Sequence, residues 1–170
     1  MRWAALLSLA ACASMVQAPA VPTARFPRTW DEPRAARVLA VLDIHSKLKG
    51  EDAEALDATY FSNEIRAAAR RRAPAMQVMT RENVLVLLEA QGKKLEDCEG
   101  ECEVDTGRRL GADLVVAGDL LRVGSEFKLD LRLYSTRDGQ LLGGATAGGQ
   151  TVDELDAHTP AAVGQLLGLP

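Results

Sequence analysis

Two of the three cysteines lie four residues apart, in the segment Cys98-Glu99-Gly100-Glu101-Cys102. A disulfide between Cys98 and Cys102 would close a very small loop and stabilise the fold by roughly 2 kcal/mol on a loop-entropy argument. Two free thiols are the first alternative. A metal site is the second, but two cysteines without a nearby histidine do not complete the tetrahedral set that zinc requires. We favour the disulfide.

The third cysteine, Cys12, follows small residues at the end of a short apolar run. Arg2 supplies one positive charge, and the run over residues 3–11 ends in Leu-Ala-Ala. The run is too short to span a bilayer and fits a secretory signal with small residues before the cut. Leu-Ala-Ala-Cys also resembles the lipobox of bacterial lipoproteins, in which the cysteine carries diacylglycerol and cleavage occurs just before it.

The lipobox resemblance implies that residues 1–11 are a signal peptide and that Cys12 is the lipidation site. It implies an outer-membrane lipoprotein of the cell envelope that faces the periplasm. The alternative is a soluble periplasmic or secreted protein, cut after Ala18 or Ala20. Residues 12–33 contain four prolines with small residues and no apolar period. This composition predicts an extended, semi-rigid tether between the anchor and a folded domain.

The remaining polar residues do not assemble a recognised catalytic motif. His45 and His158 are not spaced as metal ligands, and the sequence contains no nucleophile elbow, P-loop or dinucleotide fingerprint. An acidic cluster beside the cysteines could bind Ca²⁺, although its spacing fits no EF-hand. This cluster is Glu99, Glu101, Glu103 and Asp105. We therefore assign no catalytic residue, cofactor or metal, and expect a protein that is not an enzyme.

The composition is that of a globular protein with a sizeable core. Hydrophobic residues make up 47% of the 170 residues and charged residues 26%. Aromatic residues contribute only 4%, so leucine, valine and alanine must fill that core. The net charge of -4 argues against a nucleic-acid partner, because phosphate binding requires a basic face. Residues 34–170 are expected to form one domain.

The first half of this domain is predicted to form a strand, a helix, a second strand and a second helix. Residues 37–44 form a near-continuous apolar run, which is typical of a strand covered on both faces. Residues 51–72 predict one helix with acidic residues at its start, arginines at its end, and a single apolar face. That face is Leu56, Tyr60, Phe61, Ile65, Ala68 and Ala69. A short strand at residues 76–79 precedes a helix capped by Thr80, whose Val84, Leu87 and Leu88 are expected to face the core.

The second half begins with a short helix near residues 104–110 and continues with three strands. The first spans residues 114–123, and the second alternates cleanly from Phe127 to Tyr134, which predicts a half-buried antiparallel strand. The Asp138-Gly139 hairpin leads to a third strand with four glycines, which we attribute to close helix packing or an edge bulge. A capping box at Thr151 opens a last helix, and Thr159-Pro160 predicts a break in it.

The predicted order is therefore β-α-β-α-α-β-β-β-α, an α/β (α+β) fold with a mixed sheet of about five strands and helices packed on it. Three stretches carry a family resemblance. They are the opening strand Arg37-Val-Leu-Ala-Val-Leu-Asp43, the segment Gly111-Ala-Asp-Leu-Val-Val-Ala-Gly-Asp119, and the hairpin from Leu131 to Leu142. Together they resemble the envelope fold that is shared by the TolB amino-terminal domain and the lipoproteins CsgG, FlgO and LpoB.

This resemblance covers residues 37 to 167 and implies a periplasmic α/β domain that binds other proteins and is not itself an enzyme. The chain lacks the pore-forming hairpins of CsgG and the propeller repeats of TolB. The expected function is therefore a membrane-tethered module that binds an envelope protein or helps assemble an envelope complex. One alternative is a small-ligand or metal sensor that uses the Cys98–Cys102 loop. The other is an unrecognised hydrolase that uses His45 or His158.

Overall fold

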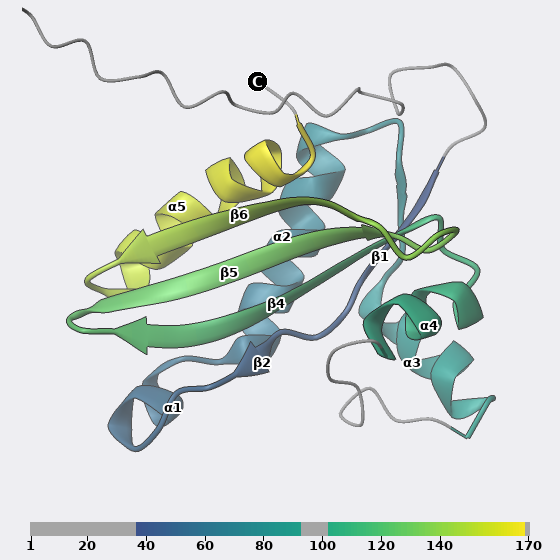
Figure 1. Ribbon diagram of the computed structural model, residues 1–170. Coiled ribbons are helices and arrows are strands. Elements are labelled where there is room, and N and C mark those ends of the chain that lie inside the picture. The colour runs from purple at the N-terminus through teal and green to yellow at the C-terminus, as the bar shows by residue number, and fades with distance from the viewer. Residues whose placement is uncertain (1–36, 93–101, 169–170) are drawn as a thin grey trace, which may run out of the picture.

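The computed structural model describes residues 37–92 and 102–168, which build a mixed sheet flanked by helices (Figure 1). The described strands are β1 (Val38–Val41), β2 (His45–Ser46), β3 (Gln77–Val78), β4 (Leu114–Val123), β5 (Glu126–Ser135) and β6 (Leu141–Gly149). Their order across the sheet is β3-β1-β4-β5-β6, and β2 pairs with β4 beyond the end of β1. β3, β1, β2 and β4 pair in parallel, whereas β5 and β6 add antiparallel. The predicted mixed sheet is confirmed.

Five helices are described, and four of them divide between the two faces of the sheet. They are α1 (Glu51–Ala55), α2 (Ala58–Arg72), α3 (Arg81–Glu89), α4 (Cys102–Arg109) and α5 (Val152–Leu166). α2 and α5 cover one face, whereas α3 and α4 lie on the other, near β1 and the start of β4 (Figure 1). No helix in the described ranges is long and apolar enough to cross a membrane.

The predicted continuous helix over residues 51–72 is wrong, because the chain turns between α1 and α2. Leu56 adopts an extended conformation and is buried at 3% exposure. Asp57 then caps α2, and its carboxylate accepts a hydrogen bond from the Thr59 N–H over 2.7 Å. Aspartate competes well for the free N–H groups of a helix start. The acidic run that suggested one long helix therefore supplies the cap of a second one.

Two residues expected in the core are exposed. Tyr60 is 45% exposed, and its hydroxyl donates to the Asp156 carboxylate of α5 over 3.0 Å. Leu87 on α3 is 38% exposed, while Val84 and Leu88 are buried. Helical periodicity identifies the correct face in both helices but assigns the residues at its border wrongly.

The predicted break in the last helix is also wrong, since α5 is continuous across Pro160. Thr159 does not cap a new helix: it is fully buried, and its hydroxyl donates to the carbonyl of Leu155 within α5. Proline removes one backbone hydrogen bond from a helix. Burial of Leu155, Val163 and Leu166 on both sides of the proline holds the two halves in one helix.

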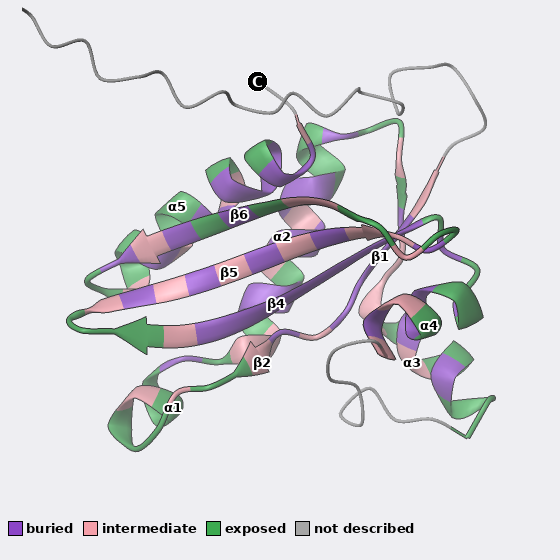
Figure 2. Cartoon of the chain, viewed as in Figure 1, coloured by how far each residue is buried: buried purple, intermediate pink, exposed green. Residues whose placement is uncertain are grey.

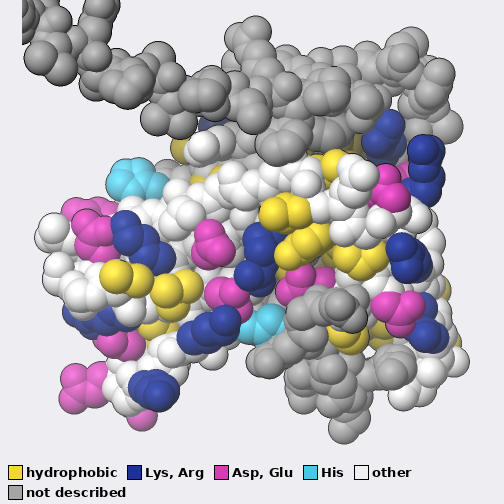
Figure 3. Space-filling view, viewed as in Figure 1, with side chains coloured by type: hydrophobic (Ala, Val, Ile, Leu, Met, Phe, Trp, Pro, Cys, Tyr) yellow, Lys and Arg dark blue, Asp and Glu magenta, His cyan; other side chains and the backbone are white. Residues whose placement is uncertain are grey.

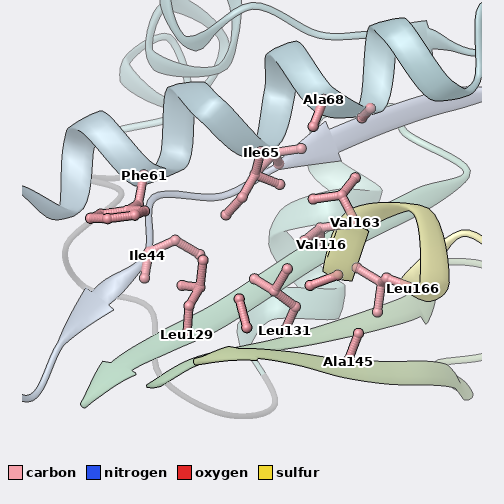
Figure 4. Packing of buried hydrophobic residues seen from close by; sticks show 14 of the residues in the cluster. Ile44, Phe61, Ile65, Ala68, Val116, Leu129, Leu131, Ala145, Val163 and Leu166 are labelled. Atoms are coloured by element: carbon pink, nitrogen blue, oxygen red, sulfur yellow. The ribbon is translucent and has the colours of Figure 1, made fainter. Parts of the chain in front are cut away.

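The main core lies between the sheet and the α2–α5 layer. Along β5, buried residues alternate with partly exposed ones, as the sequence predicted (Figure 2). Phe61 and Ile65 of α2 point towards the inward side chains of β5, among them Leu129 and Leu131 (Figure 4). Val163 and Leu166 of α5 complete the layer (Figure 4). Aliphatic side chains thus fill a core that has few aromatic rings.

Close packing explains part of the glycine cluster in β6. A Cβ atom on Gly149 would lie 2.5 Å from the backbone nitrogen of Leu155, so the start of α5 could not approach the strand. At Gly143 the nearest atom, the carbonyl oxygen of Leu166, is 3.6 Å away, which is an ordinary contact. β5 and β6 also change register between Leu133 and Tyr134. The prediction of close helix packing is confirmed at Gly149, and the predicted irregularity lies at the start of the same strand pair.

Two arginines from different helices hold the carboxylate of Asp43, just after β1. Arg66 of α2 donates to Asp43 Oδ1 over 2.9 Å and to the carbonyl of Val41 over 2.6 Å. Arg81, the first residue of α3, donates to Asp43 Oδ2 over 2.8 Å. Burial works to raise the pKa of Asp43, but hydrogen bonds from Arg81 and Arg66 outweigh it and hold the pKa below its usual value. This ion cluster ties β1, α2 and α3 together.

Asp43→Asn is expected to lower the free energy of unfolding by about 3 kcal/mol, because the buried Arg66 guanidinium loses its anionic partner. The pKa of Asp43 is lower in the folded state than in the unfolded state. Its contribution is therefore complete above the unfolded-state pKa near 3.8 and is lost as the pH falls through the folded-state value. Urea unfolding at neutral and acidic pH measures both effects.

The matched control is Glu64→Gln, which removes a surface ion pair with Arg71 at 3.9 Å. Such an exposed pair contributes less than about 1 kcal/mol. A loss in Asp43→Asn no larger than that of the control would show that the ion cluster does not hold the fold together.

Candidate functional site

One side of the sheet is only partly covered by the described helices. α3 and α4 pack on Ala40, Leu42 and Val115, at the β1 end of the sheet. The same side of β6, of the first half of β5 and of the second half of β4 has no helix over it among the described elements (Figure 1). We call this surface the open face. It consists of Asp119, Leu121, Val123, Lys128, Asp130, Arg132, Tyr134, Gly144, Thr146 and Gly148, together with His45 of β2.

A network of paired charges occupies the centre of the open face. Arg132 of β5 lies 3.0 Å from Asp119 of β4 and 3.6 Å from Glu103 of α4. Lys47 contacts the second oxygen of Asp119 over 3.1 Å. Asp119 and Glu103 are only 7% and 4% exposed, so these carboxylates are largely desolvated. The network joins α4, β4 and β5 and fixes the position of Arg132.

Burial raises the pKa of Glu103, although the Arg132 guanidinium acts in the opposite direction. Burial also raises the pKa of the neighbouring Tyr134, and the Glu103 carboxylate adds to that rise. Arg132 itself keeps one buried nitrogen, Nε, without a hydrogen-bond partner. The centre of the face therefore carries charge in a partly dry environment, where electrostatic contacts are stronger than in water.

Exposed apolar side chains flank this charged centre. Val123 at the end of β4 is 57% exposed, and Leu141 at the start of β6 is 54% exposed. Between them, Lys128 forms an ion pair with Glu126, and the Asp130 carboxylate accepts a hydrogen bond from the Thr146 hydroxyl over 3.0 Å. Figure 3 shows charged side chains gathered in the middle of the view, with hydrophobic side chains to either side. Oriented charge beside exposed apolar groups is the chemistry of a protein-binding surface.

The two histidines lie far apart in the sequence and have different surroundings. His45 lies in β2, is half-buried, and is the strand partner of Asp119 on the open face. His158 is exposed on α5, and its Nδ1 lies 2.6 Å from the carbonyl oxygen of Gly148. A carbonyl only accepts, so Nδ1 carries the proton and donates. Neither contact sets a histidine beside a serine or threonine nucleophile.

The acidic cluster does not converge on one point within the described residues. Glu103 faces Arg132 on the sheet, whereas Asp105 pairs with Arg109 over 2.7 Å on the surface of α4. Residues two apart on a helix point in different directions, which explains the divergence. The described residues contain no group of three potential metal ligands. Glu99 and Glu101 lie outside the described residues.

The predicted lipidation site and half of the predicted disulfide also fall outside the described residues. Cys12 belongs to the first 36 residues and Cys98 to the segment 93–101, so both assignments stay predictions. Cys102 begins α4, and its Sγ lies 3.7 Å from the Thr106 hydroxyl.

Sequence patterns pointed to part of the open face and missed its partners. The alternation in β5 already separated Lys128, Asp130 and Arg132 from the leucines of the core. Asp119 was hidden within an otherwise apolar strand, and Glu103 was grouped only with the acidic cluster beside the cysteines. A charged residue inside an apolar strand was the available signal, since such a residue requires a buried partner.

Glu103→Gln is expected to change how stability depends on pH. The pKa of Glu103 is higher in the folded than in the unfolded state, so ionising this carboxyl costs folding free energy as the pH rises above about 4.5. The glutamine does not titrate. The free energy of unfolding of the variant, relative to that of the wild type, should therefore rise between acidic and neutral pH. Urea unfolding of both proteins at matched pH measures this difference. A constant or shrinking difference would contradict the raised pKa.

Comparison with known proteins shows similarity in structure only. No protein-family model matches the sequence, and no curated protein matches it. The LpoB C-terminal domain from Escherichia coli superposes with a TM-score of 0.55 at 16% identity, covering 70% of this chain and 86% of that domain. The same domain from Salmonella enterica gives 0.54 at 16% identity, over 71% and 87%.

Lipoprotein GNA1162 from Neisseria meningitidis is similar to the same degree. Its TM-score is 0.54 at 16% identity, covering 76% of this chain and 97% of that protein. At 16% sequence identity, the similarity to these three structures is a similarity of fold alone. The resemblance to the LpoB group, which the sequence suggested, is thus confirmed at the level of structure: this chain has the α/β fold of the LpoB C-terminal domain and of GNA1162.

Proposed function

We propose that this protein is a non-enzymatic envelope lipoprotein, anchored through Cys12, whose α/β domain over residues 34–170 binds a protein partner. The observation that carries this proposal is the open face. It is a large sheet surface without a described helix over it, with a preformed charge network at its centre and exposed Val123 and Leu141 beside it. Its partner is an envelope protein, and the outer membrane facing the periplasm is the expected location.

The paired charges favour a protein partner over a nucleic acid. Arg132 and Lys47 both contact Asp119, so the open face presents balanced charge and no basic patch that could hold phosphates. Charges already fixed by neighbours lose little conformational freedom when a partner binds, which supports specific recognition. The shared fold gives further support, because one of the similar structures is named as a lipoprotein.

The alternatives have less support. A metal or small-ligand sensor built on the acidic cluster would need Glu103 and Asp105 to converge, but each is paired with a different arginine. A hydrolase would need a histidine beside a nucleophile, and the hydrogen bond of His158 goes to a backbone carbonyl.

The anchor is tested by Cys12→Ala. The wild type is expected to fractionate with membranes and to incorporate labelled palmitate, and the variant should lose both properties, because the thiol is the site of lipid attachment. The matched control is the double variant Cys98→Ala and Cys102→Ala, which leaves Cys12 intact and should stay in the membrane fraction. A Cys12→Ala protein that remains membrane-bound would overturn the lipoprotein assignment.

The open face is tested by site-specific photocrosslinking in intact cells. A photoreactive amino acid at Val123 or Lys128 should give an adduct with one and the same envelope protein, identified by mass spectrometry. The same group at the exposed Asn63 of α2, on the opposite side of the sheet, is the control and should not give this adduct.

A charge reversal on the open face separates specific contact from proximity. Arg132→Glu places a carboxylate beside Asp119 and Glu103 and should reduce the adduct from Val123 at least about tenfold, while the protein level is monitored by immunoblot. An adduct that forms equally from Asn63, or that survives the reversal, would place the partner elsewhere.

A further inference from the structure

One end of the domain gathers the starts of three strands and the end of a fourth. The Gln77 N–H donates to the Arg37 carbonyl over 2.9 Å, which sets the start of β3 beside the start of β1. The Asp113 N–H donates to the Val38 carbonyl over 2.9 Å, and the Thr136 N–H donates to the Asp113 carbonyl over 3.0 Å. The starts of β1, β3 and β4 therefore lie beside the end of β5.

Two basic helix ends meet the sheet at the same place. α2 ends just before Ala73, whose carbonyl accepts from the Met76 N–H over 2.9 Å ahead of β3. In the last turn of α4, Arg108 donates from Nε to the Thr136 carbonyl over 2.5 Å, so this turn adjoins the end of β5. Arginines suit the negative end of each helix dipole. The topology brings both sets to one end of the domain.

Five arginines gather at this end, and we call them the arginine pole. They are Arg37, Arg70, Arg72, Arg108 and Arg137. Arg70 and Arg137 are exposed and form no ion pair with any residue that the structure describes. Arg108 bonds to a neutral carbonyl, which leaves its positive charge uncompensated. Figure 3 shows dark blue side chains along the right-hand rim, where α4 and the β5–β6 hairpin lie in the same view of Figure 1.

Acidic residues near the pole are too few to cancel it. Glu64 and Asp105 are paired with two further arginines, Arg71 and Arg109. Three other acids lie at this end: Glu89, Asp113 and Asp138. The opposite end of the domain is acidic, since the first turns of α1 and α5 alone contribute Glu51, Asp52, Glu54, Asp153 and Glu154. The described domain is therefore polarised along its strands, although the whole chain has a net charge of -4.

We propose that the arginine pole docks on the surface of an anionic phospholipid bilayer. Guanidinium groups bind phosphate oxygens through paired hydrogen bonds, and basic residues are attracted to the negative potential of such a surface. The acidic end is repelled, so the domain has one preferred orientation.

The place where the chain enters the domain favours a membrane as the occupant of this surface. Residues 12–36 join the domain at Arg37, within the arginine pole. If Cys12 is anchored as proposed above, these residues hold the pole near the bilayer, and the attachment raises its effective concentration there. The segment itself adds three arginines and two acids, so it does not reverse the charge of the pole.

Docking through the pole leaves the open face accessible. β4, β5 and β6 run between the two ends of the domain (Figure 1). With the arginine pole on the bilayer, these strands point away from the membrane and the open face lies on the side of the domain. The pole and the open face therefore serve two different contacts, one with lipid and one with the proposed protein partner.

Cosedimentation with vesicles tests this inference, using the chain from residue 12 onwards with Cys12→Ser so that no lipid is attached. At about 0.01 M salt, where the Debye length is about 30 Å, the protein should pellet with vesicles of equal parts phosphatidylglycerol and phosphatidylethanolamine. It should not pellet with phosphatidylcholine vesicles, and about 1 M salt should release it, because the Debye length falls to about 3 Å.

Charge reversal locates the contact. Arg70→Glu combined with Arg137→Glu should lower the partition coefficient at least about tenfold, since each basic residue near an anionic surface contributes roughly fivefold. Lys49→Glu combined with Lys128→Glu is the matched control: it changes the net charge equally at the acidic end and should lower binding less than about twofold. Circular dichroism checks that both proteins are folded, and Arg137→Glu alone carries the test if the double variant is not.

Three results would overturn the proposal. The first is a parent protein that does not pellet with anionic vesicles, or that pellets equally with phosphatidylcholine. The second is equal weakening by the control, which would assign the effect to net charge. The third is binding to purified peptidoglycan and not to vesicles, which would assign the pole to a glycan. Because the chain tested carries no lipid, each of these results leaves the Cys12→Ala fractionation test unaffected.

Discussion

The fold depends on burying one face of β4, β5 and β6 beneath α2 and α5. Leu129, Leu131 and Leu133 lie on that face, and with few aromatic residues in the chain, aliphatic contact must supply most of the stabilisation. The period of two in a strand then forces the intervening residues onto the other side. Because α3 and α4 reach only the β1 end, most of those residues have no described helix over them and form the open face. The open face is a direct consequence of how the core is packed.

Burial on one side and exposure on the other also account for the ion pairs. Asp119 is buried within β4, and Asp43 is partly buried just after β1, so an unpaired carboxylate would be costly at either position. Each contacts two cations, Asp43 with Arg66 and Arg81, and Asp119 with Lys47 and Arg132. The Asp43 cluster lies among three elements of the scaffold, whereas the Asp119 network opens onto the surface. Similar chemistry therefore ties scaffold elements together in one place and fixes the position of Arg132 on the open face in the other.

Periodicity, caps and turn residues predicted nearly all of the strands and helices. The bounds of β4 and the caps Thr80 and Thr151 agree with the structure, because local hydrogen bonding and alternation determine them. The errors arise where tertiary contacts override local preference. Pro160 stays within α5 because both halves of the helix pack on the core, and Tyr60 is exposed because it bonds to Asp156. The partners of Asp119 could not be predicted, since Glu103 and Arg132 come from elements whose crossing only the fold defines.

The side chains of β4 and β5 form the open face, and the outer backbone groups of β6 form an edge of the described sheet. Backbone pairing at such an edge needs no particular side chain, whereas the proposed recognition at the open face depends on the positions of Arg132 and Asp119. The same β6 backbone that pairs with β5 on one side meets side chains of α5 on the other, where His158 bonds to the Gly148 carbonyl and Glu154 to the Gln150 N–H. Gly149 lets the start of α5 come this close to the strand, so close helix packing and the capping of this edge have one common cause.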